Sequence, residues 1–162
     1  MSQDQLPTSG FESAAQHHVP AIFMQHTGTW QGEYIKTNTQ GQFLRSFWGA
    51  FTIAIEGKTY QQLNHYRYPD GSQLELHFAG AFINGILHMT SPSYSDFAAI
   101  AWDAGQETIC FRSSKTQDEA VITFIETITL LAPDRRVRST HALKDGVFDG
   151  ISFIQEVRSI KA

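Results

Sequence analysis

Cysteine is almost absent: the 162-residue chain contains one, Cys110, which excludes an internal disulfide bond and a cluster of thiolate metal ligands. Long apolar runs are absent too, since no stretch approaches the roughly 20 residues that a membrane-spanning helix needs. The N-terminus, MSQDQLPTSG, is polar and lacks the basic segment of a secretory signal peptide. From these absences we expect a cytoplasmic protein without a membrane span.

An excess of positive charge is also lacking. The 12 Lys and Arg residues against 16 Asp and Glu residues give a net charge of −4, which favours neither nucleic acid nor an anionic membrane as a partner. The sequence has no GxSxG nucleophile motif, P-loop, dinucleotide-binding fingerprint or HExxH motif. The adjacent His17 and His18 have no carboxylate or cysteine to complete a ligand set, so no metal site is predicted.

What remains is the composition of one folded domain, with 41% hydrophobic and 17% charged residues. Residues 1–10 are expected to form a flexible leader, and residues 11–162 a single domain. The segment 11–28 is short and interrupted by Pro20, which predicts one or two helical turns. It carries four apolar side chains that would cover an apolar surface: Phe11, Ile22, Phe23 and Met24.

From Trp30 onward, runs rich in Phe, Ile, Tyr and Thr alternate with turn signals at a spacing of roughly 8 to 14 residues. This pattern predicts an all-β domain: an antiparallel up-and-down β-barrel of about eight to ten strands with a short N-terminal helical lid. Turns at 57–58, 69–72 and 84–85 set the register of the first half. All three turns keep one set of side chains on the inner face, including Phe47, Tyr60, Asn64, Tyr66, Phe78, Phe82 and Met89.

The register of the later strands predicts a pair of titratable side chains inside the barrel. Alternation over residues 121–131 places Phe124 and Glu126 on the inner face. A four-residue turn at 132–135 would then place Ser139 and His141 on that face, with His141 directly opposite Glu126. In the last strand, alternation offers Phe153 as a further inner residue. So many polar groups suit a cavity better than a packed core, because each buried polar group needs a partner.

The segment around Gly28-Thr29-Trp30, with a helix before it and strands after it, resembles the calycin superfamily of lipocalins and their relatives. The resemblance implies that Trp30 closes the bottom of the barrel, that the helix plugs it, and that an Arg near the barrel end packs on the Trp. Arg158 is the candidate, although the register above turns it outward. The sequence is also similar to nitrobindin-like haem barrels, and to lipocalin-like cyanobacterial barrels of unassigned function, some of whose relatives attach bilin pigments to proteins.

The predicted function is binding of a small, largely hydrophobic molecule with some polar groups, in the role of a carrier, sensor or chaperone. Trp30 and Gly28 are interpreted as structural. Arg45, on the inner face near the barrel end, would either bind an anionic group or extend to solvent, and we favour the second. The predicted ligand-binding residues are Phe47, Tyr60, Asn64, Tyr66, Phe78, Phe82, Met89, Phe124, Ser139 and Phe153.

Three alternatives stay open. One is an enzyme in which His141 and Glu126 carry out acid/base cyclisation, isomerisation or bilin-lyase-type chemistry. Another is a haem-binding barrel with His141 as the axial ligand, as the nitrobindin resemblance implies. The third is an interaction module whose barrel is filled by side chains. Haem and bilin are the cofactors considered, neither of them favoured, and a homo-oligomer is compatible with all readings.

Overall fold

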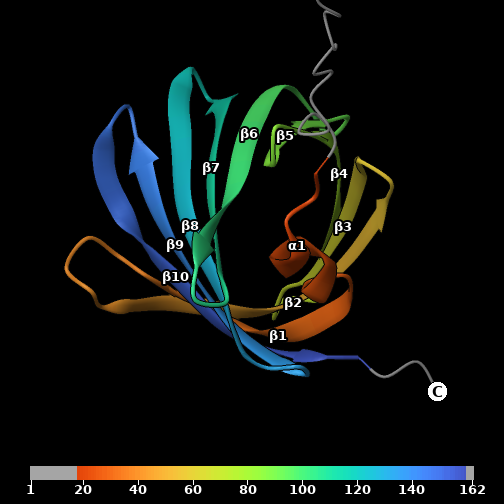
Figure 1. The fold of residues 1–162 in the computed structure, drawn as a ribbon. Coiled ribbons are helices and arrows are strands. Elements are labelled where there is room, and N and C mark those ends of the chain that lie inside the picture. The colour runs from red at the N-terminus through yellow and green to blue at the C-terminus, as the bar shows by residue number, and fades with distance from the viewer. Residues whose placement is uncertain (1–17, 160–162) are drawn as a thin grey trace, which may run out of the picture.

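The computed structural model describes residues 18–159, which form a closed barrel of ten antiparallel strands (Figure 1). The predicted leader, His17 and Phe11 lie outside the described residues. Each strand pairs with the next one along the chain, and the first pairs with the last. The strands are β1 (Gly28–Thr37), β2 (Phe43–Glu56), β3 (Thr59–Arg67), β4 (Gln73–Ile83), β5 (Ile86–Ser91), β6 (Tyr94–Gly105), β7 (Thr108–Gln117), β8 (Ala120–Ala132), β9 (Arg135–Lys144) and β10 (Val147–Arg158). The predicted up-and-down barrel is confirmed.

Tight turns set the register of the first half as predicted. Ile55 pairs with Tyr60 across the β2–β3 turn, and Phe82 pairs with Leu87 across the β4–β5 turn. In the latter turn Asn84 and Gly85 both have positive φ, 50° and 79°, which is the backbone of a type I′ turn. The inner face predicted for these strands is therefore correct, and the same alternation holds through β6, β7 and β8.

A bulge near the end of β8 reverses the predicted face of β9. Ala132 pairs with Arg135 at the turn, but Leu130 pairs with Arg136, so the register shifts by one residue between Leu130 and Ala132. A one-residue shift moves every following side chain to the other face of its strand. Consequently Arg136, and not Val137, faces the interior.

The inner faces of β9 and β10 were predicted incorrectly. The side chains that face inward are those of Arg136, Arg138, Thr140, Ser152, Ile154 and Glu156. Ser139, His141 and Phe153, which were predicted to point inward, lie on the outer face, and Phe153 is 41% exposed. In β10 a further register shift lies between Phe148 and Ile151, and beyond it Ile151 pairs with His141 and shares its outer face.

A single helical turn, α1 (Ala21–Gln25), closes one end of the barrel (Figure 1). Ile22 and Phe23 are buried among the inner side chains of β2 to β7, and the Phe23 ring lies edge-on to Phe82 at 4.9 Å between centroids. Met24 is 48% exposed and does not take part in this contact, which corrects the prediction for that residue. The helix begins after Pro20, which has the extended backbone expected ahead of a helix start.

Gly32 lets β1 and β10 approach each other closely. A Cβ atom built on Gly32 would overlap the carbonyl oxygen of Gln155 in β10. Only a glycine fits at such a contact.

In the described part of the chain, no helix is long and apolar enough to span a membrane.

Candidate functional site

The barrel encloses a cavity of about 490 Å³. Its lining includes Lys36, Tyr68 and Gln117, which lie where β1, β3 and β7 reach the turns farthest from α1. The cavity therefore occupies the half of the barrel opposite the helix. A space of this size does not fit a barrel filled by side chains.

A second hollow, of about 510 Å³, lies outside the barrel between α1 and the β8–β9 turn, against Gln25, Leu131 and Pro133. Glu107 and Arg158 are its charged side chains, and Arg158 already donates hydrogen bonds to the carbonyl oxygens of Gln25, Thr27 and Pro133. With that guanidinium committed, few polar groups converge on the outer hollow. We therefore place the candidate site in the barrel.

Most of the predicted ligand-binding residues line the barrel cavity: Phe47, Asn64, Tyr66, Phe78, Met89 and Phe124. Tyr60 and Phe82 do face inward, but they are buried below the cavity in the core that contacts α1. Ser139 lies on the outer face because of the β8 bulge, and Phe153, its cross-strand partner on β10, shares that face. The structure thus brings six of the ten predicted residues together around one space.

The predicted pair of Glu126 and His141 is not formed. Glu126 lies opposite Thr140, which donates a hydrogen bond to its carboxylate at 2.7 Å, and it pairs with Arg138 at 3.1 Å. His141 lies opposite Ile125 on the outer face and is exposed. It therefore reaches neither the carboxylate nor the cavity, and the acid/base pair and the haem ligation expected of it do not fit this site.

A ladder of hydrogen bonds runs along the inner face of β3. The Tyr60 hydroxyl donates to the side-chain oxygen Oε1 of Gln62 at 2.5 Å, and the side-chain amide of Gln62 donates to Oδ1 of Asn64 at 2.6 Å. The side-chain amide of Asn64 then donates to the Tyr66 hydroxyl at 3.0 Å. Because every donor points toward the cavity, the Tyr66 O–H is left free to donate. Burial raises the pKa of Tyr66, which keeps this group protonated.

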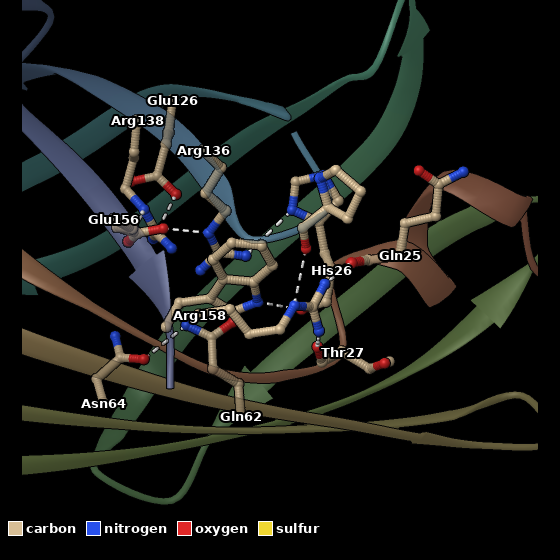
Figure 2. A network of polar contacts seen from close by, with 12 residues as sticks. Gln25, His26, Thr27, Gln62, Asn64, Glu126, Arg136, Arg138, Glu156 and Arg158 are labelled. Atoms are coloured by element: carbon tan, nitrogen blue, oxygen red, sulfur yellow. Dashed lines mark hydrogen bonds and ion pairs between the residues drawn. The ribbon is translucent and has the colours of Figure 1, made fainter. Parts of the chain in front are cut away.

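Below the cavity lies a buried cluster of charged groups (Figure 2). Arg138 joins the carboxylates of Glu126 and Glu156, each at 3.1 Å, and Arg136 pairs with Glu156. Two arginines and two glutamates balance each other, as buried charges require. Burial acts to lower the pKa of Arg138, but Glu126 and Glu156 outweigh it and hold that pKa well above its usual value.

His26 connects this cluster to the helix. Its Nδ1 accepts a hydrogen bond from Arg136 Nη1 at 3.1 Å, and its carbonyl oxygen accepts one from the Trp30 indole N–H at 3.0 Å (Figure 2). Burial, aided by the nearby positive charges of Arg136, Arg138 and Arg158, lowers the pKa of His26 to about 3. The imidazole is therefore neutral near pH 7.

Trp30 is fully buried between two guanidinium groups and the helix. The Cζ atoms of Arg158 and Arg136 lie 4.2 and 4.3 Å from the indole centroid. An arginine near the barrel end thus packs on the Trp, as the resemblance implied. Arg158 shares the inner face of β10 with Ile154 and Glu156, so the predicted register that turned it outward is wrong. Gly28 has φ +97°, and a Cβ there would lie 3.1 Å from Arg158 Nη1.

Sequence reasoning missed several cavity residues. Lys36 follows from simple alternation with Trp30 and Tyr34 along β1, a signal that was available but not used. Arg138 was hidden by the bulge, which no feature of the turn sequence announces. The cavity residues that were missed include Tyr34, Lys36, Tyr94, Ser113, Lys115, Gln117, Arg138, Thr140 and Ser152.

Comparison with known families gives one match over most of the chain. Residues 16–160 match the family described as Domain of unknown function (DUF3598), N-terminal. Among curated proteins, none matches the sequence. A DUF3598-family protein of unknown function from Nostoc punctiforme is 14% identical, with a TM-score of 0.64, and the match covers 92% of this chain and 53% of that one. The chain therefore spans about half the length of that protein.

Two further solved structures share the fold. The S-type phycobiliprotein lyase CPES from Guillardia theta is 13% identical, with a TM-score of 0.61, over 88% of this chain and 93% of that one. Rv2717c from M. tuberculosis is 16% identical, with a TM-score of 0.56, over 88% of this chain and 99% of that one. At such identities the likeness shows the fold alone.

Proposed function

The chain belongs to the DUF3598 N-terminal domain family, and for it we propose binding of a small, largely hydrophobic molecule that carries some polar groups. Because the family description states no function, the proposal rests on the barrel. The observation that carries this proposal is the cavity of about 490 Å³ inside a barrel closed at one end by α1. Sites for small molecules are typically about 300–1,000 Å³ and are lined by aromatic side chains with a few placed polar groups.

The lining has this mixed character. Aromatic rings from several strands face the space, among them Phe47, Phe78 and Phe97, and the Phe78 and Phe97 rings contact each other with centroids 5.0 Å apart. The free O–H of Tyr66 supplies a directional donor at the same surface. Such an arrangement holds an apolar molecule and selects one polar feature of it.

The role of the binder is part of the proposal. A carrier, a sensor and a chaperone all need a cavity of this kind. A cytoplasmic location remains a prediction, and a homo-oligomer is compatible with each role. The fold is shared with a phycobiliprotein lyase. Because one barrel frame serves unrelated ligands, a bilin in this cavity stays an open alternative that we do not favour.

The test uses N-phenyl-1-naphthylamine, a neutral apolar probe that fluoresces in dry pockets. Ser113 lines the cavity and Ser114, its neighbour on β7, lies on the outer face, so they form a matched pair. We expect saturable binding to the natural chain, weakened about tenfold or more by Ser113→Phe, which fills the cavity, and unchanged by Ser114→Phe. Circular dichroism checks that both variants fold.

Two outcomes would overturn the proposal: no saturable binding to the natural chain, or equal affinity in both folded variants. If Ser113→Phe does not fold, Tyr66→Phe takes its place. The readout is then how strongly alcohols of one fixed chain length compete with the probe for the cavity. Native mass spectrometry and a visible absorption spectrum of protein purified from its own host then identify the natural occupant. A visible absorption band would identify a pigment, and extra mass without colour a lipophilic molecule.

A further inference from the structure

Two cations face each other at the open end of the barrel. Lys36 of β1 and Arg45 of β2 are direct cross-strand partners, and both line the cavity. Like charges placed directly opposite each other on one face of a sheet destabilise it. An arrangement that costs stability at a cavity mouth calls for a functional reason.

The carboxylates of the cavity do not compensate these cations. Glu126 is the one acidic side chain among the described residues that line it, and Glu126 is already paired with Arg138. Lys115 adds a further positive charge from β7, five strands away from β2 around the barrel and so on the opposite wall. Over residues 18–159, none of Lys36, Arg45 and Lys115 forms an ion pair with a carboxylate.

Aromatic rings hold two of these cations at the mouth. The Arg45 guanidinium lies 5.6 Å from the ring centroid of Phe47 and 5.9 Å from that of Tyr68. The Lys115 ammonium lies 4.0 Å from the ring of Tyr94 on the other wall. Such contacts keep a charged group at the boundary between apolar lining and water instead of letting it extend freely into solvent.

We infer that the molecule bound in the barrel is an amphipathic acid, with its acidic group between Lys36 and Arg45 and its apolar body among the rings below. An anion at this position accepts hydrogen bonds from both cations and removes their mutual repulsion. The planar fork of Arg45 suits a carboxylate in particular. This inference rests on the proposed function and adds to it the charge of the ligand and its direction in the barrel.

The orientation follows from the order of the groups along the barrel. The cations occupy the rim, the rings of Phe78 and Phe97 lie below, and the charge-balanced pair of Arg138 and Glu126 lies at the floor. An acidic group at the floor would meet the carboxylate of Glu126. The rim is therefore the site for the acid, and the Tyr66 O–H is left for a second polar atom deeper in the ligand.

The test compares decanoate with 1-decanol, which have the same chain and differ in charge. Isothermal titration at low ionic strength measures both affinities for the natural chain, for Lys36→Met with Arg45→Met, and for Arg67→Met. Arg67 is an exposed cation at the same end of the barrel on the outer face, so its removal changes net charge but not the mouth. We expect decanoate to bind about tenfold tighter or more than 1-decanol, both to the natural chain and to Arg67→Met.

In the double variant, Lys36→Met with Arg45→Met, we expect decanoate and 1-decanol to bind with about equal affinity. The affinity for 1-decanol should stay as it is in the natural chain. The inference is overturned if the natural chain binds both molecules equally, or if the double variant keeps its preference. Failure of all variants to bind either molecule would instead overturn the proposed function.

Lys36→Glu supplies a measurement that needs no ligand. It should raise the melting temperature by creating an opposite-charge pair with Arg45. No rise would contradict the repulsion on which the inference depends.

Discussion

The guanidinium group of Arg158 lies over the indole ring of Trp30, with Cζ 4.2 Å from the ring centroid. The two residues are cross-strand partners of β1 and β10, so this contact lies where the first and last strands close the barrel. Arg158 also donates hydrogen bonds to the carbonyl oxygens of Gln25, Thr27 and Pro133. One side chain thus joins α1, the first strand and the β8–β9 turn.

Replacing this side chain is expected to loosen that end of the barrel. Arg158→Ala removes three hydrogen bonds from a charged donor and one cation–π contact, and should lower the free energy of unfolding by about 2–3 kcal/mol. Urea denaturation followed by tryptophan fluorescence measures the change.

The matched control is Arg67, whose guanidinium lies at the same distance, 4.2 Å, over the ring of Trp48 on the outer face. Arg67→Ala should cost less than about 1 kcal/mol, because solvent competes with the contact. If both variants lose the same stability, the hydrogen bonds of Arg158 do not stabilise the barrel end as described.

The success and the failure of the sequence reading have the same physical cause. Hairpins closed by tight turns carry their register in the turn residues, and Asn84-Gly85 fixed the pairing of Phe82 with Leu87 as predicted. A bulge has no comparable signature: the turn itself pairs Ala132 with Arg135 as predicted, and the shift comes only between Ala132 and Leu130.

The candidate site divides along the same line. Residues on β2 to β8, such as Asn64, Tyr66 and Phe124, follow from alternation and were predicted. Arg136 and Arg138 contradict the expectation that charged side chains point outward, and only their partner carboxylates explain their burial. Such a partnership links β8, β9 and β10 across the barrel wall and cannot be read from any one strand.

Glu156 tests that buried partnership. It is 1% exposed and pairs with both Arg136 and Arg138. Glu156→Gln keeps the size of the side chain but leaves two buried guanidinium groups with one carboxylate, so the free energy of unfolding should fall by about 3–5 kcal/mol. Equilibrium denaturation in urea gives the value. Glu75→Gln, which removes an exposed partner of His77, should change it by less than about 1 kcal/mol, and similar losses in the two variants would contradict the role assigned to the cluster.

Gly32 tests the close approach of β1 and β10. Gly32→Ala places a methyl group where the carbonyl oxygen of Gln155 lies, so the two strands must separate. We expect a loss of about 3 kcal/mol or more, measured by thermal unfolding. Gln31→Ala, one residue earlier on the outer face, should stay within about 1 kcal/mol of the natural chain. Normal stability in Gly32→Ala would mean that the strands pair less tightly than the structure shows.

His26 makes the stability of the fold depend on pH. Its pKa is about 3 in the folded chain, against an ordinary value of 6.5 for an unfolded one, so below pH 6.5 the unfolded chain binds a proton that the folded chain does not. The free energy of unfolding must therefore fall as the pH falls, by about 1.4 kcal/mol for each pH unit between these two values. From about pH 7 to about pH 5 we expect a loss of about 2 kcal/mol from this residue, measured by urea denaturation at each pH.

His26→Gln separates this effect from the titration of other groups. Glutamine offers an oxygen to accept the hydrogen bond of Arg136 but binds no proton in this range, so the variant should lose about 2 kcal/mol less than the natural chain between about pH 7 and about pH 5. The difference between the two slopes is the quantity to compare, since all other titrating groups are common to both proteins. Parallel slopes would mean that the imidazole takes up its proton in the folded barrel, which requires the Arg136 hydrogen bond to break and the helix end to open.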